Sequence, residues 1–299
     1  MLVTAQAARY RAHGGPEVLG LEEIPLPQPG PGQVRIAVRA AGVNPIDWKL
    51  RRGFMGAPPD EPQGTGLELA GTIDALGPGV TGWRLGDPVF GQVQAGAAAT
   101  HAIAEAGALA AKPDDLTYEE AAALPVAVET ARRALDGLGL EEGHTLLIHA
   151  VAGGVGLAAA QLALAGGARV VGTAGERHHD FLRGLGVHPV TYGEGLEERL
   201  PGPVDRVLDA SGRGELELSV KLAGDPANVI TIADRAGAAR LGVRFSSGGG
   251  AKGPVRHQNV RIPIAESFPL ERIADAHRLS EDGHFLGKIV VNTEGTLPR

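Results

Sequence analysis

The chain of 299 residues contains no cysteine, and this absence removes several kinds of chemistry at once. Disulfide bonds, cysteine nucleophiles and thiolate metal sites are all excluded. Aromatic residues make up only 4% of the chain, and no uninterrupted apolar segment is long enough to span a lipid bilayer. The first residues also lack the basic region and long apolar core of a secretory signal. We therefore expect a soluble cytoplasmic protein without a membrane partner.

Positive charge is also scarce and is nowhere concentrated. The formal net charge is -7 at pH 7, and the charged side chains are dispersed without a basic run or an acidic tail. A nucleic-acid-binding surface needs clustered lysine and arginine, so we expect no nucleic-acid partner. The length is sufficient for two domains with separate cores.

A glycine-rich turn at residues 149–156, His-Ala-Val-Ala-Gly-Gly-Val-Gly, is the most informative stretch of the sequence. An apolar run precedes it at 145–148, an alanine- and leucine-rich segment follows at 157–165, and a second apolar run covers 168–173. The order strand, tight turn, helix, strand is typical of a dinucleotide pyrophosphate site.

The glycines of this turn have physical tasks in such a site. Gly153 lets the backbone approach the phosphates, Gly156 lets the helix pack closely on the sheet, and the first free N–H groups of the helix point at the anion. The fingerprint is incomplete because Val151 stands where the first glycine is usual, and a helix start without a ligand is the alternative. The flanking pattern favours dinucleotide binding. The residues that we predict to bind the cofactor here are Ala152, Gly153, Gly154, Val155 and Gly156.

The N-terminal part of the chain, from residue 1 to about 125, has the pattern of a small, twisted β-barrel-like domain. Short runs such as 33–40 alternate polar and apolar residues, and clusters of proline and glycine separate them. A helix is predicted after Thr117, because Glu120 three residues later completes a capping box, and a second helix follows at 126–138.

From residue 143 to about 250, strands and helices alternate, which predicts a parallel sheet with right-handed crossovers. The predicted strands cover 145–149, 168–173, 187–191, 204–209, 227–233 and 240–246. The predicted helices between them cover 155–166, 177–185, 194–199 and 214–223.

The last part of the chain is predicted to begin with a flexible loop at 246–253. A short strand at 260–264, an amphipathic helix at 270–279 and a final strand at 287–291 follow. We expect this tail to rejoin the N-terminal domain.

Several short motifs occur in a fixed order along nearly the whole chain. They cover residues 14–19, 41–47, 66–71, 79–81, 86–89, 124–125, 130–131, the glycine-rich turn and 287–291. In this order they resemble the medium-chain dehydrogenase/reductase superfamily, specifically its zinc-free quinone oxidoreductase (ζ-crystallin-like) branch.

The resemblance implies an α/β fold with a GroES-like β-barrel-type catalytic domain and a Rossmann domain built on a doubly wound parallel sheet. The expected divisions are the N-terminal part of the catalytic domain at 1–125, the NADP-binding Rossmann domain at 126–255, and a return to the catalytic domain at 256–299. The resemblance also implies NADPH as the cofactor and a homodimer that pairs through the last Rossmann strand near 241–246.

Zinc-dependent relatives carry metal ligands at three positions where this chain has Asn44, Leu67 and Val126. The four-cysteine structural zinc lobe is absent too, so the resemblance implies a site without a metal. The chain is also shorter than is usual for the family. The deficit lies at 250–259, where relatives lead us to expect a helix.

The resemblance places three residues near the reacting groups. Asn44 would lie beside the nicotinamide, Trp48 stands where relatives often carry a tyrosine that meets the substrate, and Thr130 would lie near the nicotinamide ribose or amide. Each residue type also has a structural explanation, because turns favour asparagine, tryptophan packs well, and helical threonines bond the backbone. Asp47 is expected to be mainly structural.

The end of the second Rossmann strand distinguishes NAD from NADP. NAD sites usually place an acidic residue there, whereas this chain has the neutral Thr173. A cation at Arg177 favours the 2′-phosphate of NADP, and Tyr192 matches a tyrosine that reaches this phosphate in relatives. Glu176 opposes this interpretation, because it could repel the phosphate or pair with Arg177. The residues that we predict to bind this end of the cofactor are Thr173, Gly175, Arg177, His178 and Tyr192.

The carboxyl ends of the later parallel strands also face the ligand crevice. The contacts predicted there are Asp209, Ala210, Ile232 and Ala233, together with Phe245, Ser246 and Ser247, which resemble the segment that touches the carboxamide. Arg256 and His257 are cationic and remain unassigned. His149 is expected to be buried and hydrogen-bonded rather than catalytic.

Together these features predict an NADPH-dependent, zinc-independent oxidoreductase that transfers hydride to a small-molecule quinone or related activated enone. No general acid stands out, so binding, orientation and polar groups would carry the catalysis. Two alternatives stay open. One is an enoyl or alkenal double-bond reductase with the same fold, and the other is a non-catalytic NADPH-binding protein.

Overall fold

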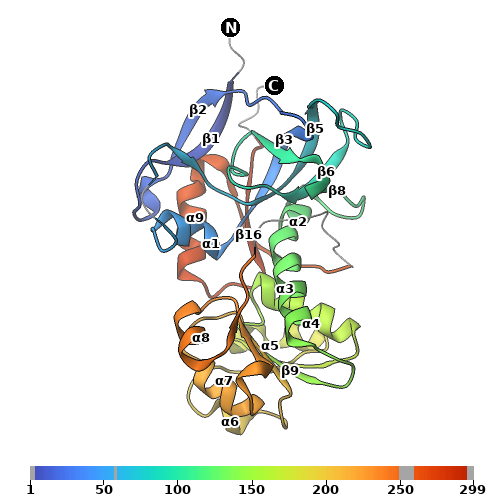
Figure 1. The fold of residues 1–299 in the computed structure, drawn as a ribbon, viewed down its shortest axis with the longest axis vertical. Coiled ribbons are helices and arrows are strands. Elements are labelled where there is room, and N and C mark those ends of the chain that lie inside the picture. The colour runs from blue at the N-terminus through green and yellow to red at the C-terminus, as the bar shows by residue number, and fades with distance from the viewer. Residues whose placement is uncertain (1–3, 57–58, 249–258, 295–299) are drawn as a thin grey trace.

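The computed structural model describes residues 4–56, 59–248 and 259–294. The described strands form three sheets, two at one end of an elongated molecule and the third at the other end (Figure 1). Helices α2 (Tyr118–Ala122) and α3 (Pro125–Leu138) run between the two ends. No helix in the described ranges is long and apolar enough to cross a bilayer.

The first two sheets contain most of the N-terminal part of the chain and its C-terminal tail. Their strands are β1 (Thr4–Tyr10), β2 (Gly20–Pro25), β3 (Gln33–Val43), β4 (Gln63–Gly64), β5 (Glu68–Leu76), β6 (Pro88–Gln92), β7 (His101–Glu105), β8 (Leu109–Ala111), β15 (Ile264–Pro269) and β16 (Lys288–Asn292). One sheet has the order β2-β1-β4, and the other has the order β15-β16-β3-β5-β6-β8 with β7 against β3. The predicted return of the tail is confirmed, because β16 pairs antiparallel with β3.

The third sheet is parallel and forms the Rossmann domain. Its strands are β9 (Thr145–His149), β10 (Arg169–Thr173), β11 (His188–Val190), β12 (Arg206–Asp209), β13 (Val229–Thr231) and β14 (Arg244–Phe245). The order β11-β10-β9-β12-β13-β14 reverses direction beside β9, which is the arrangement of a dinucleotide-binding sheet. All residues of β9 are buried, as expected for a central strand covered on both faces.

The helices begin and end where local chemistry permits. Besides α2 and α3 they are α1 (Pro45–Arg51), α4 (Gly154–Ala165), α5 (His179–Gly184), α6 (Leu196–Arg199), α7 (Leu216–Ala223), α8 (Arg235–Leu241) and α9 (Ile273–Asp282). Short 3-10 helices are η1 (Pro16–Val18), η2 (Ala106–Ala108), η3 (Glu176–His178), η4 (Pro226–Asn228) and η5 (Leu270–Arg272). The predicted capping box of α2 is confirmed. Thr117 Oγ1 accepts a hydrogen bond from the Glu120 amide, and Glu120 Oε2 accepts one from the Thr117 amide.

The predicted strand at 240–246 is largely wrong. Its first residues belong to α8, which Asp234 caps by accepting a hydrogen bond from the Gly237 amide at 2.8 Å. The helix ends at Gly242, whose positive φ suits a glycine, and only β14 at Arg244–Phe245 remains extended. The alternation of polar and apolar residues at 240–246 therefore spans two elements, the end of α8 and the short strand β14.

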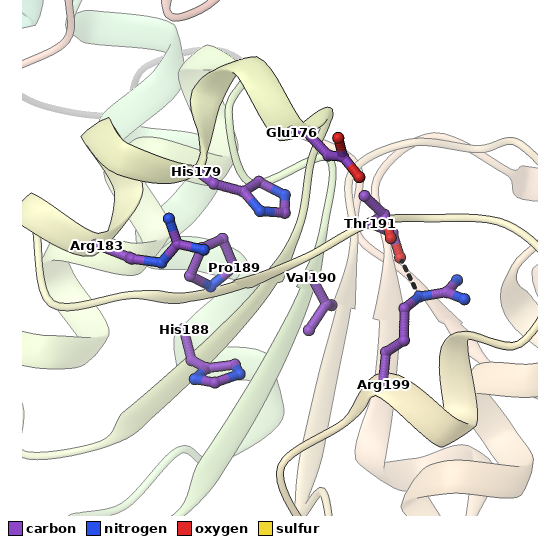
Figure 2. Close-up of a pocket in the computed structure, with 8 residues that line it drawn as sticks. All are labelled: Glu176, His179, Arg183, His188, Pro189, Val190, Thr191 and Arg199. Atoms are coloured by element: carbon purple, nitrogen blue, oxygen red, sulfur yellow. Dashed lines mark hydrogen bonds between the residues drawn. The ribbon is translucent and has the colours of Figure 1, made fainter.

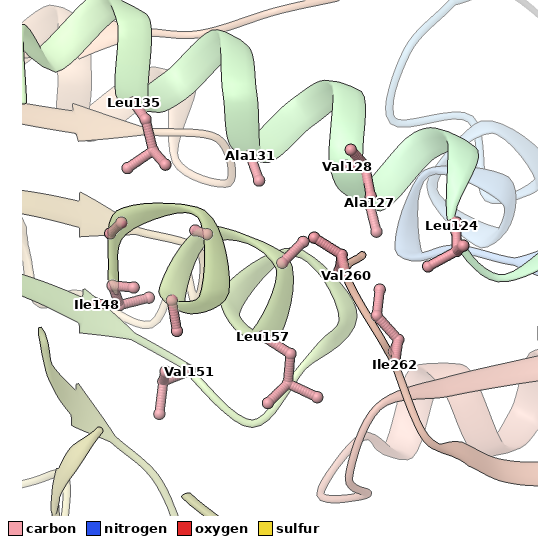
Figure 3. Close-up of a cluster of buried hydrophobic side chains, with 14 of the residues drawn as sticks. Leu124, Ala127, Val128, Ala131, Leu135, Ile148, Val151, Leu157, Val260 and Ile262 are labelled. Carbon is pink, nitrogen blue, oxygen red and sulfur yellow. The ribbon is translucent and has the colours of Figure 1, made fainter. Parts of the chain in front are cut away.

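The predicted strand at 260–264 is also largely wrong, because residues 260–263 lie outside the strands and only Ile264 belongs to one, as the first residue of β15. The backbone of Arg261 instead exchanges hydrogen bonds of 2.9 and 3.0 Å with the side chain of Gln161 on α4. Val260 and Ile262 lie in the cluster of buried side chains that also contains Leu157 (Figure 3). The alternating pattern reflects alternating burial against a helix, and the strand β15 starts only after this crossing.

The apolar packing joins the two ends of the molecule. One buried cluster contains residues of the N-terminal sheet, residues of α2 and α3, and residues of the Rossmann sheet and α4. The predicted boundary near residue 125 coincides with the start of α3 but stays a prediction. The boundary at 255, the segment 250–258 with its expected helix, most of the predicted loop at 246–253, and Arg256 and His257 lie outside the described residues.

The turn after β9 shows how Val151 is accommodated where the dinucleotide-binding fingerprint usually has its first glycine. Ala150 adopts a left-handed backbone with φ of 57°, and the next residue, Val151, is fully buried. Space for the Val151 side chain comes from Gly172 on β10, where a Cβ atom would lie 2.4 Å from Val151 Cγ1. The missing glycine of the fingerprint is thus compensated by a glycine on the neighbouring strand.

Replacement of Gly172 by alanine is expected to destabilise the protein by about 1–3 kcal/mol, because the new methyl group overlaps Val151. The variant Val151→Ala removes the overlapping atoms, so it should lose less stability in the Gly172→Ala background than in the natural one. Urea unfolding of the two single variants and the double variant measures this coupling. Strictly additive losses would contradict the packing described here.

Candidate active site

The glycine-rich turn forms an open cradle at the start of α4. Its first-turn amides at 154–156 have no acceptor within the helix. A Cβ at Gly153 would meet only the Ala150 carbonyl oxygen at 3.5 Å, so the space beside this residue is open. At Gly156 a Cβ would lie 2.5 Å from the same oxygen, so only glycine allows the helix to start so close to the turn. This donor set without side-chain bulk fits the pyrophosphate of a dinucleotide.

The cradle is attached to the C-terminal strand β16. The Gly287 amide donates a 2.8 Å hydrogen bond to the Ala152 carbonyl, and Gly287 forms a parallel bridge with Gly153. The stem of Lys288 covers Gly154, where a Cβ would lie 2.7 Å from Lys288 Cδ. The predicted phosphate-binding turn and the last strand of the catalytic domain are therefore in direct contact.

Lys288 links this contact to a buried polar network. Its ammonium donates to Glu68 Oε1 at 2.5 Å and to Asn44 Oδ1 at 2.6 Å. Asn44 Nδ2 donates to the same Glu68 oxygen at 2.7 Å, and the other Glu68 oxygen accepts from the Val126 amide at 2.7 Å. Each of these three side chains is at most 5% exposed. The network joins β16, β5, the start of α1 and the start of α3.

Asp47 extends the network at the first turn of α1. Its Oδ2 accepts a 2.7 Å hydrogen bond from the Asn44 amide, and the residue is almost completely buried. Burial raises the pKa of the Asp47 carboxyl to about 7, although the hydrogen bond from Asn44 and the charge of Lys288 oppose the rise. The expectation that Asp47 is structural agrees with these contacts.

Asn44 was predicted to lie beside the nicotinamide. The structure places it at the start of α1, with both ends of its amide engaged by Glu68 and Lys288 and with 4% of its surface exposed. Its side chain therefore orients the network around the cradle. A direct contact with the cofactor stays a prediction.

Trp48 and Lys49 are consecutive on α1, and each has donors that meet no acceptor in the described part of the chain. The indole Nε1 of Trp48 is buried and has no hydrogen-bond partner among the described residues. The ring meets Phe54 edge-on at 6.1 Å between centroids, and the Lys49 ammonium lies 5.6 Å from the Trp48 ring centre. Burial lowers the pKa of Lys49, and the carboxylate of Asp209 at the end of β12 opposes this effect.

Thr130 and Ser246, predicted at the nicotinamide end, are brought together by one arginine. Arg133 Nη2 donates to Thr130 Oγ1 at 3.4 Å, and Nη1 donates to Ser246 Oγ. The same guanidinium pairs with Glu129 one turn earlier at 3.0 Å. Next to Ser246, the Arg235 guanidinium lies 4.7 Å from the ring centre of Phe245, while Ser247 is exposed.

The ends of β12 and β13 are held by the carboxylate of Asp209. Its Oδ1 accepts from the amides of Ser211 and Gly212 at 2.9 and 3.0 Å, and its Oδ2 accepts from the Thr231 hydroxyl at 2.7 Å. The Asp209 carbonyl accepts from the Ile232 amide at 3.0 Å. The carboxylate thus shapes the turn that carries Ala210, and it lies at the same end of the sheet as Ile232 and Ala233.

The residues predicted at the 2′ end of the cofactor have different surroundings. Thr173 is buried, and its hydroxyl accepts from the Ala150 amide at 3.1 Å, so it supports the turn. Arg177 is exposed and donates to the His284 carbonyl and, at 3.2 Å, to His178. Tyr192 is half exposed, and a Cβ at Gly175 would meet nothing within 4 Å. Burial and the neighbouring Arg177 lower the pKa of His178.

His149 has the buried environment that was expected. It is completely buried, with Nε2 at 3.0 Å from the Ser219 hydroxyl and Nδ1 at 3.5 Å from the Thr173 hydroxyl. Burial lowers its pKa, since the charged imidazolium is poorly solvated there. A neutral imidazole satisfied on both nitrogens acts as a packing residue.

A cavity of about 460 Å³ lies beside the predicted 2′ end, at the edge strand β11 (Figure 2). It is lined by His179 and Arg183 of α5, His188 of β11 and Arg199 of α6, together with the carboxylate of Glu176. The Arg199 guanidinium is already used, since Nε donates to the Thr191 carbonyl at 3.2 Å. A second cavity of about 370 Å³ lies against α1 and is lined by residues that include Tyr10, Asp47 and Leu67.

Glu68, Lys288, Lys49 and Arg133 are the residues that the sequence-based prediction missed. Glu68 and Lys288 both stand within apolar strand segments, where an unpaired charge is costly. Opposite charges inside two strands were therefore a signal for a buried pair. Nothing in the sequence indicated which oppositely charged residue Glu68 or Lys288 would pair with.

The described parts of the chain show no cluster of side chains suited to bind a metal ion. They contain no group of three or more histidine, aspartate or glutamate residues that could hold a metal ion. Leu67 lines the second cavity, and Val126 donates its amide to Glu68. The absence of a metal from the reaction stays a prediction.

Comparison with known proteins identifies the family. Residues 30–116 match the alcohol dehydrogenase GroES-like domain family, and residues 253–291 match the zinc-binding dehydrogenase family. The 2-methylene-furan-3-one reductase of Solanum lycopersicum is 32% identical over 96% of this chain and 79% of the relative. The chloroplastic NADPH-dependent alkenal/one oxidoreductase of Arabidopsis thaliana is 33% identical over 94% of this chain and 78% of the relative.

Solved structures agree with this relationship. The quinone oxidoreductase from Coxiella burnetii superposes with a TM-score of 0.84 at 28% identity, covering 97% of this chain and 100% of that one. The Escherichia coli quinone oxidoreductase complexed with NADPH superposes with a TM-score of 0.82 at 25% identity, covering 96% and 99%. The chain belongs to the medium-chain dehydrogenase/reductase superfamily. It is an oxidoreductase with a GroES-like domain and a Rossmann domain.

Stability should fall between about pH 4 and about pH 7 because of Asp47. Its pKa in the folded protein, about 7, exceeds the ordinary value of 3.8, so the folded state keeps a proton that the unfolded state releases. The stabilisation is complete below the unfolded pKa and is lost as pH rises through the folded pKa, with a slope of at most about 1.4 kcal/mol per pH unit.

The variant Asp47→Asn isolates this contribution, because it cannot titrate. Urea unfolding of both proteins across this pH range should give a stability difference that shifts in favour of the variant as pH rises. Parallel pH profiles would show that Asp47 does not carry a raised pKa.

Proposed function

We propose that the protein is an NADPH-dependent, zinc-independent reductase that transfers hydride to quinones or related activated enones. The observation that carries this proposal is the open glycine cradle fixed by Gly287 and Lys288 against the Asn44 end of α1. The names of the relatives support the same substrate class, since they include an enone-type reductase, an alkenal/one oxidoreductase and quinone oxidoreductases. A nicotinamide dinucleotide is the cofactor.

The chain's own residues would bind and orient the reactants. The α4 amides and the open side of Gly153 would hold the pyrophosphate, and the turn shaped by Asp209 would carry backbone contacts to the nicotinamide ribose. When bound, the reduced nicotinamide supplies the hydride. The network of Asn44, Glu68 and Lys288 would keep the cradle and α1 in register so that the reactants meet in one orientation.

Preference for NADPH over NADH rests on the end of β10. Thr173 is neutral there and is engaged by the turn, so the strand end itself offers no carboxylate to a ribose 2′-hydroxyl, and the nearest one is the exposed Glu176. Arg177 is exposed beside the open Gly175, and its guanidinium suits a phosphate. The Escherichia coli relative is complexed with NADPH, and the Arabidopsis thaliana relative is named as NADPH-dependent, which supports the same choice.

A double-bond reductase acting on alkenals is the second candidate. It is favoured by the extent of the similarity, because the alkenal/one oxidoreductase aligns with 94% of this chain. The human quinone oxidoreductase is 37% identical but aligns with 73% of it. Both candidates use the same cradle and differ in the acceptor. A non-catalytic NADPH-binding role is the third possibility, and it predicts binding without turnover.

The purified protein should oxidise NADPH in the presence of 1,4-benzoquinone, 9,10-phenanthrenequinone or an α,β-unsaturated aldehyde. Absorbance of the reduced nicotinamide gives the rate for each acceptor, and the ratio between acceptors distinguishes the two reductase candidates. NADH should be used less well. NADPH binding without oxidation in the presence of any acceptor would contradict both reductase candidates and leave the binding role.

The variant Arg177→Gln tests the choice of cofactor in the same assay. It should raise the KM for NADPH by about tenfold, the effect of one lost charge-assisted contact of about 1.4 kcal/mol, and leave NADH kinetics nearly unchanged. Arg240→Gln is the matched control, since this exposed arginine on α8 pairs with Glu217 away from the cradle. Equal effects of Arg177→Gln on both cofactors would argue against a phosphate contact.

We also propose a homodimer formed through β14. This strand lies at the edge of the six-stranded sheet and pairs only with β13 in the described chain, so its outer side could continue the sheet into a second copy. Sedimentation equilibrium should give twice the chain mass of 30.7 kDa. A monomer at assay concentrations would contradict this assembly.

A further inference from the structure

Lys49 is a half-buried cation without a polar partner among the residues that the structure describes. The described lysines Lys112, Lys221 and Lys288 each donate at least one hydrogen bond to a carbonyl or carboxylate. The Lys49 ammonium donates none to any residue that the structure describes, although the side chain is only partly exposed. Partial burial of a charge without a partner is unfavourable, so an acceptor from outside the chain would be favoured there.

The position of Lys49 relates it to the cofactor cradle. It lies on α1, one turn after Asn44, whose side chain contacts the same Lys288 that covers Gly154. The charge that acts most on the Lys49 ammonium is Asp209 at the carboxyl end of β12. Carboxyl ends of parallel strands form the ligand edge of a Rossmann sheet. The Lys49 ammonium is therefore within the electrostatic reach of the edge where the nicotinamide ring is expected.

Asp209 is not a simple ion-pair partner for Lys49. Its oxygens already accept hydrogen bonds from Ser211, Gly212 and Thr231, and no ion pair joins Asp209 to Lys49. The carboxylate acts on the ammonium through its charge alone, and no residue that the structure describes accepts a hydrogen bond from Lys49. This arrangement differs from that of Lys288, whose ammonium is bound directly by a carboxylate at 2.5 Å.

A second donor at the same place also lacks an acceptor. Trp48 Nε1 is buried without a partner in the described residues, and the Lys49 ammonium is 5.6 Å from the centre of that indole ring. An unsatisfied buried N–H group costs about 1–3 kcal/mol. Two neighbouring donors without acceptors fit a ligand that presents an oxygen acceptor on an apolar, flat framework, as quinones and enones do.

We propose that Lys49 is a catalytic residue whose ammonium binds the carbonyl oxygen of the quinone or enone substrate. This inference rests on the proposed reductase function. Hydride from the reduced nicotinamide dinucleotide forms a new C–H or O–H bond on the acceptor, and the displaced π-electron pair moves to the carbonyl oxygen. The ammonium stabilises the resulting oxyanion by hydrogen bonding. A proton from water then completes the reduced product, and the dinucleotide is left oxidised.

Kinetics of Lys49→Met and Lys49→Arg test the charge itself. Lys49→Met should lower kcat by about 10- to 100-fold, because one donor to a developing oxyanion is lost, while the KM for NADPH stays within about twofold. Lys49→Arg keeps the charge and should recover most of kcat. Lys221→Met is the matched control, an exposed lysine paired with Glu197, and should behave like the natural protein. Unchanged kcat in Lys49→Met would overturn the proposal.

Binding of 4-nitrophenol provides a readout that needs no turnover. The phenolate absorbs at longer wavelength than the phenol, so a pH titration with saturating protein reports the pKa of the bound phenol. A cation at the oxygen should lower this pKa in the natural protein and in Lys49→Arg but not in Lys49→Met. Equal ionisation in all three proteins, including no binding by any of them, would overturn the role of Lys49.

The two measurements separate this proposal from the proposed function. If none of the acceptors supports NADPH oxidation by the natural protein, the reductase function fails. The phenolate titration still decides whether Lys49 binds an oxyanion. If the natural protein is active and both readouts are unchanged in Lys49→Met, only the role of Lys49 fails. Unfolding curves of the variants show whether each one is folded under the assay conditions.

Discussion

The buried ammonium of Lys288 is the interaction on which the geometry of the site depends. It bonds Asn44 and Glu68 directly, and its stem covers Gly154 in the cradle. A buried ion pair is tolerated only when its remaining hydrogen-bonding groups are satisfied, and here the Asn44 amide and the Val126 amide complete the set around Glu68. One side chain near the C-terminus thus sets the distance between α1 and the glycine-rich turn.

Small residues make this close arrangement possible. Gly156 allows α4 to start against the turn, and Gly172 leaves room for the buried Val151. Alanine-rich faces of α3 and α4 pack against each other in the same buried cluster that reaches the N-terminal sheet. Apolar packing and the polar network both cross the junction between the sheets. Two independent sets of contacts therefore fix the position of α1 relative to the cradle.

Strong periodic patterns predicted the fold well, and weak ones did not. The strand, turn and helix around the cradle lie where the sequence placed them, as do the two helices after Thr117 and the last strand. Errors occurred at 240–246 and 260–264, where alternation came from a helix end and from a segment crossing α4. Such short stretches of alternation are compatible with several structures, and tertiary contacts decide between them. Glu68 and Lys288 meet across 220 positions of sequence, a pairing that no local pattern encodes.

Composition, order of motifs and local chemistry were sufficient to determine the class of the protein. The absence of cysteine follows from composition alone. The glycine-rich turn between strands, and the change from successive strands to alternating strands and helices, are patterns of neighbouring residues that can be recognised segment by segment. The tertiary structure alone decided which charges would be neutralised and which would remain free. Burial and partnership depend on segments far apart in the chain, and for that reason Lys288 is paired with Glu68, while the Lys49 ammonium meets the Trp48 ring and bonds to no residue that the structure describes.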